Sequence, residues 1–401
     1  MNPSNGALLL GGALLILSFI YGKLSAKTKI PSVLWLIATG ILLRLQADSV
    51  RFVLPYQRSG VEILGTLGLL FVVLEGSLDL EINRQKRRLI LQSSGAAILG
   101  VLATLLAVAY PATLLLNISW REALVNAAPL AVISSAIAIP SAVSLSPRLR
   151  EFVVYESSLS DIVGVLLFGM LIATEPLSLS SVAGLLLAVA GTLTVGLGCA
   201  AATLLLFKYV EGATRSVFVY AVLVVLYGLG KLLHFPSLLI IFSFGIAIRN
   251  PSLIFRRLLG QYRENADVAG VSEKLHELTA EVAFVVRTFF FVLFGYTIEL
   301  HYLLTYESIL SAFVVVPCIL FCRWIVLRLI GSDYWRRLTF FAPRGLISVI
   351  LFFSIPRELR HPDVTQGVLL TVIMFTNLLM IVDLTRSGHQ KIVTAASEDR
   401  R

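Results

Sequence analysis

The sequence predicts an all-α polytopic membrane protein with about thirteen transmembrane helices. The chain has 401 residues, of which 57% are hydrophobic and only 14% are charged, whereas about a quarter of the residues in a soluble domain are charged. Apolar runs close to the length that a bilayer-spanning helix needs, about 20 residues, recur from end to end. A few charged residues lie inside these runs, where they are costly, and they are the first candidates for function.

Thirteen apolar segments follow one another along the chain. They span residues 7–24, 31–45, 61–79, 88–116, 121–145, 150–174, 182–207, 217–233, 236–248, 277–300, 306–330, 334–355 and 365–384. The second and ninth segments are short and the fourth is long, so we expect tilt or kinking. The first segment lacks the basic start and the small-residue cleavage site of a signal peptide, and we interpret it as the first membrane helix.

The distribution of Lys and Arg predicts the orientation. Most of them fall in the alternate connections that lie inside if the N-terminus is outside, so we expect an external N-terminus and a cytoplasmic C-terminus in the plasma or inner membrane. The longest connection, 250–274, is then cytoplasmic; we expect it to link two halves or to form a short surface helix, and 385–401 to be a short basic tail. The net charge of +9 is explained by these loops, so we expect no nucleic-acid partner.

The sixth segment carries two carboxylates, Glu156 and Asp161, in an otherwise apolar run. Charged groups at membrane depth usually line a bundle interior or a wet cavity, where they mark ion or proton pathways. Five helical residues correspond to roughly 7.5 Å of rise and about 140° of rotation. The two carboxylates therefore face different neighbours and are expected to have different roles.

Two segments are interrupted by proline at comparable places. Ile133–Ser141, with Pro140, interrupts the fifth segment, and Phe341–Gly345, with Pro343, interrupts the twelfth. Non-helical backbone at membrane depth persists only within protein or beside a water-filled cavity. A pair of broken helices in the two halves indicates inverted repeats and a binding site at the midplane of a secondary transporter. The alternative is a pair of ordinary proline kinks.

The charged residues inside the apolar segments are expected to form ion pairs with one another. A buried arginine is effectively always protonated and needs a partner, so we expect Glu156 to pair with Arg323 as a structural lock. Asp161 is then the better candidate for a carboxylate that alternately binds a proton and a cation. The alternative is that Asp161 pairs with Arg344 and that all four charges are structural. A further acid, Glu75, lies on the third segment and is expected to face Arg287 or another helix in a structural role.

These motifs, in this order on thirteen segments, resemble the monovalent cation/proton antiporters, specifically the NhaP/NHE-like sodium/proton exchanger branch of the cation:proton antiporter superfamily. The stretch from Glu156 to Asp161 resembles its Glu-x-x-x-Asn-Asp signature. Pro343-Arg344-Gly345 resembles its Arg-Gly motif on the second broken helix, and Arg323 matches the arginine of the preceding helix. Phe71–Gly76, with Glu75, and Arg287–Gly295 are similar to its third-helix and tenth-helix stretches.

The resemblance implies a single exchanger-type membrane domain over 1–401. A scaffold of helices at about 7–79 and 182–300 would form a homodimer in the bilayer. A core of helices at about 88–174 and 306–384 would move like an elevator. The ion site would lie at Asp161, where the two broken helices cross at the midplane.

Two departures from the family pattern limit the ion ligands. Ser160 replaces the family's Asn, and Ala138-Ile139-Pro140 replaces its Thr-Asp-Pro. The remaining oxygen donors are freed carbonyls, water and a set of side chains, which we expect to include Asp161, Ser160, Ser157 and Ser135, with Ser134 and Ser141 as further hydroxyls. Asp161 would hold the transported alkali cation, and a single titrating carboxylate predicts electroneutral exchange.

The sequence therefore predicts a secondary active transporter that exchanges Na⁺, K⁺ or Li⁺ for H⁺, with no cofactor. The alternative is a transport-inactive or regulatory membrane protein that retains the fold, which the changes at Ile139 and Ser160 suggest. A channel is disfavoured because no filter-like repeat accompanies the core arginines. An intramembrane enzyme is disfavoured because the sequence lacks a Gly-Asp pair, a His-Glu-x-x-His motif and a Ser/His pair at membrane depth.

Overall fold

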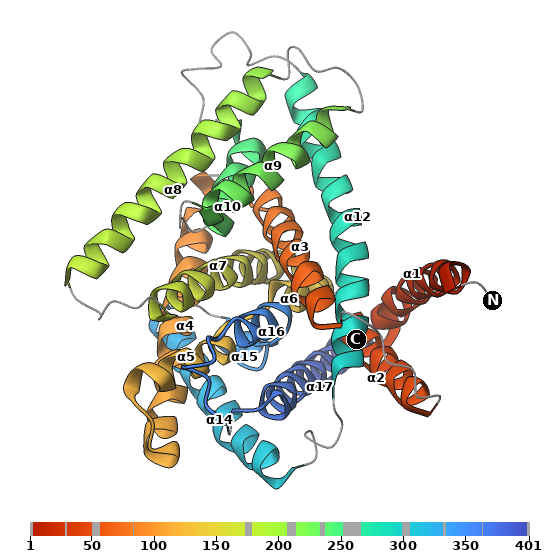
Figure 1. The fold of residues 1–401 in the computed structure, drawn as a ribbon, viewed down its shortest axis with the longest axis vertical. Helices are drawn as coiled ribbons and strands as arrows, with labels where there is room; N and C mark the ends of the chain where they lie inside the picture. The colour runs from red at the N-terminus through yellow and green to blue at the C-terminus, as the bar shows by residue number, and fades with distance from the viewer. Residues whose placement is uncertain are drawn as a thin grey trace.

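The computed structural model describes residues 3–28, 30–49, 57–82, 84–172, 179–206, 214–232, 237–251, 266–298, 305–331, 334–362 and 364–398. These residues form helices and their connections, with no strand among them (Figure 1). The helices are α1 (Pro3–Thr28), α2 (Ser32–Ser49), α3 (Gln57–Leu78), η1 (Arg84–Lys86), α4 (Arg87–Leu116), α5 (Trp120–Ala131), α6 (Ser135–Ser141), η2 (Ala142–Ser144), α7 (Pro147–Ile172), α8 (Leu179–Leu206), α9 (Thr214–Leu232), α10 (Ser237–Arg249), α12 (Ala266–Thr297), α14 (Tyr306–Leu329), α15 (Trp335–Leu338), α16 (Leu346–Phe353) and α17 (Gln366–Glu398).

The predicted all-α membrane class is confirmed. Each of the thirteen apolar segments contains helix, and among the described residues eight helical stretches are long and apolar enough to cross a membrane. Two boundaries differ from the prediction. α12 begins at Ala266, inside the predicted cytoplasmic connection, of which 252–265 lie outside the described residues. α17 runs to Glu398, so the predicted basic tail continues the last helix rather than leaving it.

Two groups of helices meet along α3, α6, α7 and α16. In Figure 1, α8, α9, α10 and most of α12 lie in the upper part of the molecule, and α4, α5, α14 and α17 lie in the lower part. α12 packs on α2 and α3, and α10 packs on α8 and α3. In the other group, α4 packs on α5, α7 and α14, and α14 packs on α17. Contacts of α3 with α6, α7 and α16 join the groups.

The backbones of α2 and α12 touch at a pair of glycines. A Cβ added at Gly40 would lie 2.1 Å from the Val292 carbonyl oxygen, and one added at Gly295 would lie 2.3 Å from the Ile37 carbonyl oxygen. Small residues allow such close approach between membrane helices, where packing rather than hydrophobic burial drives association. Large apolar side chains such as Leu115 instead project from the outer surface, as expected for lipid contact.

Candidate functional site

The two predicted interruptions are real breaks, and they touch. α5 ends at Ala131, the backbone is extended at Val132 and Ser134, and α6 starts at Ser135. In the second break, Phe341–Gly345 separates α15 from α16. The backbone N–H of Ser134 donates to the carbonyl of Pro343 at 2.9 Å. A main-chain hydrogen bond therefore joins the two broken segments inside the protein, which satisfies polar groups that lipid could not.

The position of the first break corrects the sequence analysis. Pro343 lies in the second break, but Pro140 lies inside α6, near its end, where the chain tightens into η2. A proline there removes only one late donor from a helix that is about to end. The extended backbone lies earlier, at residues 132–134, so Ala138-Ile139-Pro140 does not form the break. The residue of this region that contacts Asp161 is Ser135, at the start of α6.

Asp161 is buried, with 2% of its surface exposed, on the face of α7 that meets the start of α6. The Ser135 hydroxyl donates a short hydrogen bond to Asp161 Oδ2, and the Ser135 backbone N–H donates to the same oxygen at 3.4 Å. Asp161 Oδ1 is buried and has no hydrogen-bond partner among the residues that the structure describes. One carboxylate oxygen is therefore fixed by the chain, and the other is available to a ligand.

Other buried oxygens of the broken-helix region also lack a partner. Within the described residues they include Ser134 Oγ, Ser348 Oγ on α16 and Asn377 Oδ1 on α17. The Asn377 amide nitrogen donates to the Arg344 carbonyl at 2.9 Å, which fixes α17 against the second break. Buried polar atoms are normally satisfied, so these oxygens are candidates for contact with a water or an ion. Ser348 and Asn377 were not expected here from the sequence, although Asn377 is a polar residue inside an apolar run.

The two other serines expected at the site, Ser160 and Ser157, bond to main-chain groups. Ser160 Oγ accepts the backbone N–H of Ile133 at 3.0 Å, so it satisfies a donor that the first break leaves free. Ser157 Oγ donates to the carbonyl of Val153 at 2.7 Å on its own helix. Both are buried. Ser160 thus positions the break, and whether either hydroxyl binds an ion stays a prediction.

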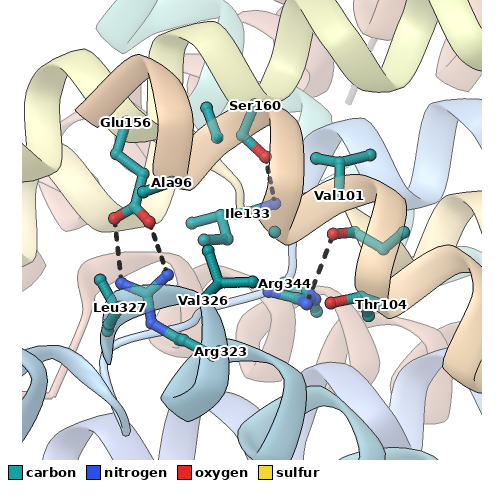
Figure 2. Close-up of a pocket in the computed structure, with 13 residues that line it drawn as sticks. Ala96, Val101, Thr104, Ile133, Glu156, Ser160, Arg323, Val326, Leu327 and Arg344 are labelled. Atoms are coloured by element: carbon teal, nitrogen blue, oxygen red, sulfur yellow. Dashed lines mark hydrogen bonds and ion pairs between the residues drawn. The ribbon is translucent and has the colours of Figure 1, made fainter. Parts of the chain in front are cut away.

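Glu156 and Arg323 form a buried, two-pronged ion pair. Arg323 Nη1 and Nη2 donate to Glu156 Oε1 and Oε2 at 2.8 and 3.0 Å (Figure 2). Arg323 Nε donates to the Leu338 carbonyl at 2.6 Å. Parallel bonds of this kind add geometric specificity to the charge attraction. The pair connects α7 to α14, and the third bond ties α14 to the end of α15.

Arg344 binds carbonyl oxygens rather than a carboxylate. Its Nε donates to the Leu130 carbonyl at 2.8 Å, Nη1 to the Ala342 carbonyl at 3.2 Å and Nη2 to the Ala131 carbonyl at 3.5 Å. The carbonyls at a helix C-terminus lack intrahelical donors and carry partial negative charge, so a cation is stabilised there. The alternative pairing of Arg344 with Asp161 is absent from the described part of the chain, because the end of α5 holds Arg344.

A small internal cavity lies next to the first break, and its wall contains both charged and apolar side chains. Its volume of about 10 Å³ gives room for about one water. Glu156, Ser160, Arg323 and Arg344 line it together with apolar residues of α4 and α14 (Figure 2). The ion pair and the capping arginine therefore share one internal space on the side of α7 that faces α4 and α14.

Glu75 and Arg287 lie at the contact between α3 and α12. Arg287 Nη1 is 3.3 Å from Glu75 Oε2, and both side chains are 17% exposed. The pairing matches the expectation from the sequence, and it joins two helices outside the broken-helix region. Nearby, His276 Nε2 lies 2.7 Å from Asp79 Oδ1 across the same helix pair.

Two broken membrane helices that meet beside a buried carboxylate are the arrangement expected of a secondary transporter. The chain belongs to the sodium/hydrogen exchanger family: the family model described as "Sodium/hydrogen exchanger, transmembrane" matches residues 13–384. It is thus a multi-pass membrane protein of an antiporter family. No curated protein matches the chain in sequence.

Solved structures show the same fold. A structure of the sodium proton antiporter MjNhaP1 from Methanocaldococcus jannaschii at pH 8 matches with a TM-score of 0.72 at 19% identity, covering 96% of this chain and 100% of that one. A structure of the same antiporter from an electron-microscopy map matches with a TM-score of 0.70 at 20% identity, covering 97% of each chain. At these identities the likeness establishes the fold.

Proposed function

We propose that the protein exchanges one monovalent cation, Na⁺, K⁺ or Li⁺, for one H⁺, and that Asp161 binds the two alternately. The observation that carries the proposal is the state of its carboxylate: Ser135 holds Oδ2, while Oδ1 has no partner within the described chain. A proton and an alkali cation both bind carboxylate oxygen, so they compete for one site. Binding of either ion releases the other, which is the requirement for exchange.

The buried charges of the core support electroneutral exchange. Glu156 and Arg323 cancel as an ion pair, which leaves Arg344 and Asp161 as the other buried charges of the described core helices. An ionised Asp161 balances Arg344, because arginine stays protonated in proteins. A bound proton or a bound monovalent cation adds the same single positive charge. The two loaded forms of the core therefore carry equal charge, so one-for-one exchange moves no net charge.

The cation ligands would come from both breaks. Alkali cations, like other hard cations, prefer several oxygen ligands. Asp161 Oδ1 supplies the charged one, and Ser134 Oγ and Ser348 Oγ are unpartnered hydroxyl oxygens on the first break and on α16. We therefore rank these three oxygens above the hydroxyls of Ser157 and Ser160 as cation ligands. The Ser160 hydroxyl already accepts a backbone N–H.

Two cavities on the boundary of α3 support alternating access. One, of about 440 Å³, is lined by Asp79, Glu81 and Glu151, and by Ile139 of α6. The other, of about 300 Å³, is lined by Gly65 of α3 and by residues at the end of α16. Residues 65 and 79 are separated by roughly 20 Å along a helix. A core that moves against α3, like an elevator, would open the site to each cavity in turn, with the remaining helices as a dimeric scaffold.

The test is cation-driven dequenching of a pH-sensitive dye in proteoliposomes, with Na⁺, K⁺ and Li⁺ across a range of pH. Asp161→Asn removes the charged ligand and the proton acceptor, so we expect exchange to be lost while the protein still folds. Asp48→Asn is the matched control, because Asp48 is exposed and its ion-pair partner among the described residues is Arg44 on α2, and full activity is expected. In the wild type, a lower pH should raise the apparent KM for the cation, because protons compete for the carboxylate.

Exchange that persists in folded Asp161→Asn would refute the assignment of Asp161. A wild type that exchanges none of the three cations, although folded, would refute the antiporter proposal and support the alternative of a transport-inactive protein that retains the fold. A KM independent of pH, together with active exchange, would refute competition at a single carboxylate.

A further inference from the structure

A basic groove lies on the surface where α4 begins and α14 ends. It has a volume of about 610 Å³ and is lined by Gln85, Arg87, Arg88, Leu91, Gln92, Ile330 and Gly331. The Gln92 side chain donates to the carbonyls of Gly331 and Ile330 at 3.1 and 3.4 Å, so the two helix ends are fixed to each other. The groove therefore has a defined shape rather than being a gap between loops.

Arg87 and Arg88 are the free cations of this groove. Both are exposed, and neither forms an ion pair within the part of the chain that the structure describes. The neighbouring Lys86, in contrast, lies 3.0 Å from Glu151. Arg328 stacks on the rings of Trp324 and Trp335, with its guanidinium carbon 5.1 and 4.6 Å from the ring centroids. Two positive charges that have no ion-pair partner among the described residues therefore face the groove.

The surroundings place the groove at the level of lipid headgroups. Trp and Tyr concentrate at the membrane–water interface, and Trp324 and Trp335 lie at this end of α14. Leu91, one turn after Arg87 on α4, is 62% exposed, and Leu329, the last residue of α14, is 74% exposed, so apolar surface suited to acyl chains adjoins the charges. The distribution of basic residues predicts that this end is cytoplasmic, the side where anionic lipids attract basic segments.

We propose that the groove binds the headgroup of an anionic phospholipid, with Arg87 and Arg88 as the phosphate ligands and Leu91 and Leu329 against its acyl chains. Charge complementarity selects an anion, and the adjoining apolar surface selects a lipid rather than a soluble phosphate. Arginine suits this role because its planar donors bind phosphate in pairs. The site lies apart from Asp161 and does not depend on the transport proposal.

The test uses the full-length protein, purified and delipidated in detergent, with phosphatidylglycerol or phosphatidylcholine as the probe. Native mass spectrometry counts the lipids that remain bound. We expect the wild type to retain phosphatidylglycerol in preference to phosphatidylcholine. Arg87→Gln/Arg88→Gln should bind phosphatidylglycerol about 30-fold more weakly, because each arginine near an anionic surface contributes roughly a factor of five to affinity.

The matched control is Arg336→Gln/Arg337→Gln on α15, which removes two exposed charges that do not line the groove. It should keep its phosphatidylglycerol, and an excess of inorganic phosphate should not displace the lipid from the wild type. Equal loss in the control would overturn the proposal in favour of general surface charge, and displacement by phosphate would overturn it in favour of a soluble anion. If the groove variant fails to fold, the phosphate competition and the comparison of the two lipids in the wild type still decide the matter.

Discussion

At the scale of single residues, four buried charges among the described core helices are satisfied in three different ways. Glu156 and Arg323 satisfy each other through two parallel bonds. Arg344 is satisfied by main-chain carbonyls at the end of α5. Asp161 is half satisfied, because only Oδ2 has a partner in the described chain. The residue that is incompletely bonded is the one to which we assign ion binding, whereas the other three hold the helices.

The ion pair leads to a stability prediction. Glu156→Gln leaves the Arg323 guanidinium buried without a counter-charge, and breaking a buried pair typically costs about 3–5 kcal/mol. We expect a clear loss of thermal stability in detergent, part of which the double variant Glu156→Gln/Arg323→Gln restores. Asp48→Asn, which breaks the exposed pair with Arg44, should cost less than about 1 kcal/mol. Absence of rescue would mean that Glu156 stabilises the core through another partner, with Arg344 the first to examine.

Ser160 provides a second test at this scale, because its hydroxyl accepts the Ile133 N–H. Ser160→Ala leaves that N–H buried without a partner, which costs about 1–3 kcal/mol. Ser160→Asn restores a side-chain acceptor and should recover stability. Ser157→Ala is the matched control and should cost little, because the Ser157 hydroxyl returns to its own helix at Val153. Equal thermal stability of Ser160→Ala and Ser157→Ala would contradict the positioning role.

At the scale of elements, the breaks and the close helix contacts determine the architecture. Each break ends one short helix and starts another, and the hydrogen bond from Ser134 to Pro343 holds them together. In the other group of helices, α2 and α12 approach until their backbones touch at Gly40 and Gly295. Here a methyl group is already too large, so the contact depends on residue size alone.

Gly40→Ala tests this contact. Its new Cβ would fall 2.1 Å from the Val292 carbonyl oxygen, so α2 and α12 must separate. Overpacking typically costs about 1–3 kcal/mol, and we expect a lower melting temperature in detergent. Gly12→Ala on α1 is the control, because a Cβ there meets nothing within 4 Å and alanine favours helix. A Gly40→Ala protein as stable as Gly12→Ala would show that the two helices do not pack this closely in solution.

At the scale of the whole molecule, the sequence predicted the class of fold because the bilayer imposes a length and an apolar composition on every crossing segment. The positions of the breaks were less predictable. Proline indicated the second break, but the first depends on tertiary contacts at Ile133 and Ser134 that no local pattern reveals. The partners of Arg344 were missed because carbonyl oxygens carry no signal in a sequence. Ser348 and Asn377 belong to distant segments that only folding brings to this region.

The bond between the two breaks has a consequence for how such a site can evolve. It joins the N–H of Ser134 to the carbonyl of Pro343, and both groups belong to the main chain. Every residue except proline offers the same N–H, and every residue offers the same carbonyl. The side chains at 134, 135 and 348 can therefore change from one lineage to another without loosening the crossing. A main-chain join of this kind would let single substitutions alter the proposed ion site while the crossing of the two breaks persists.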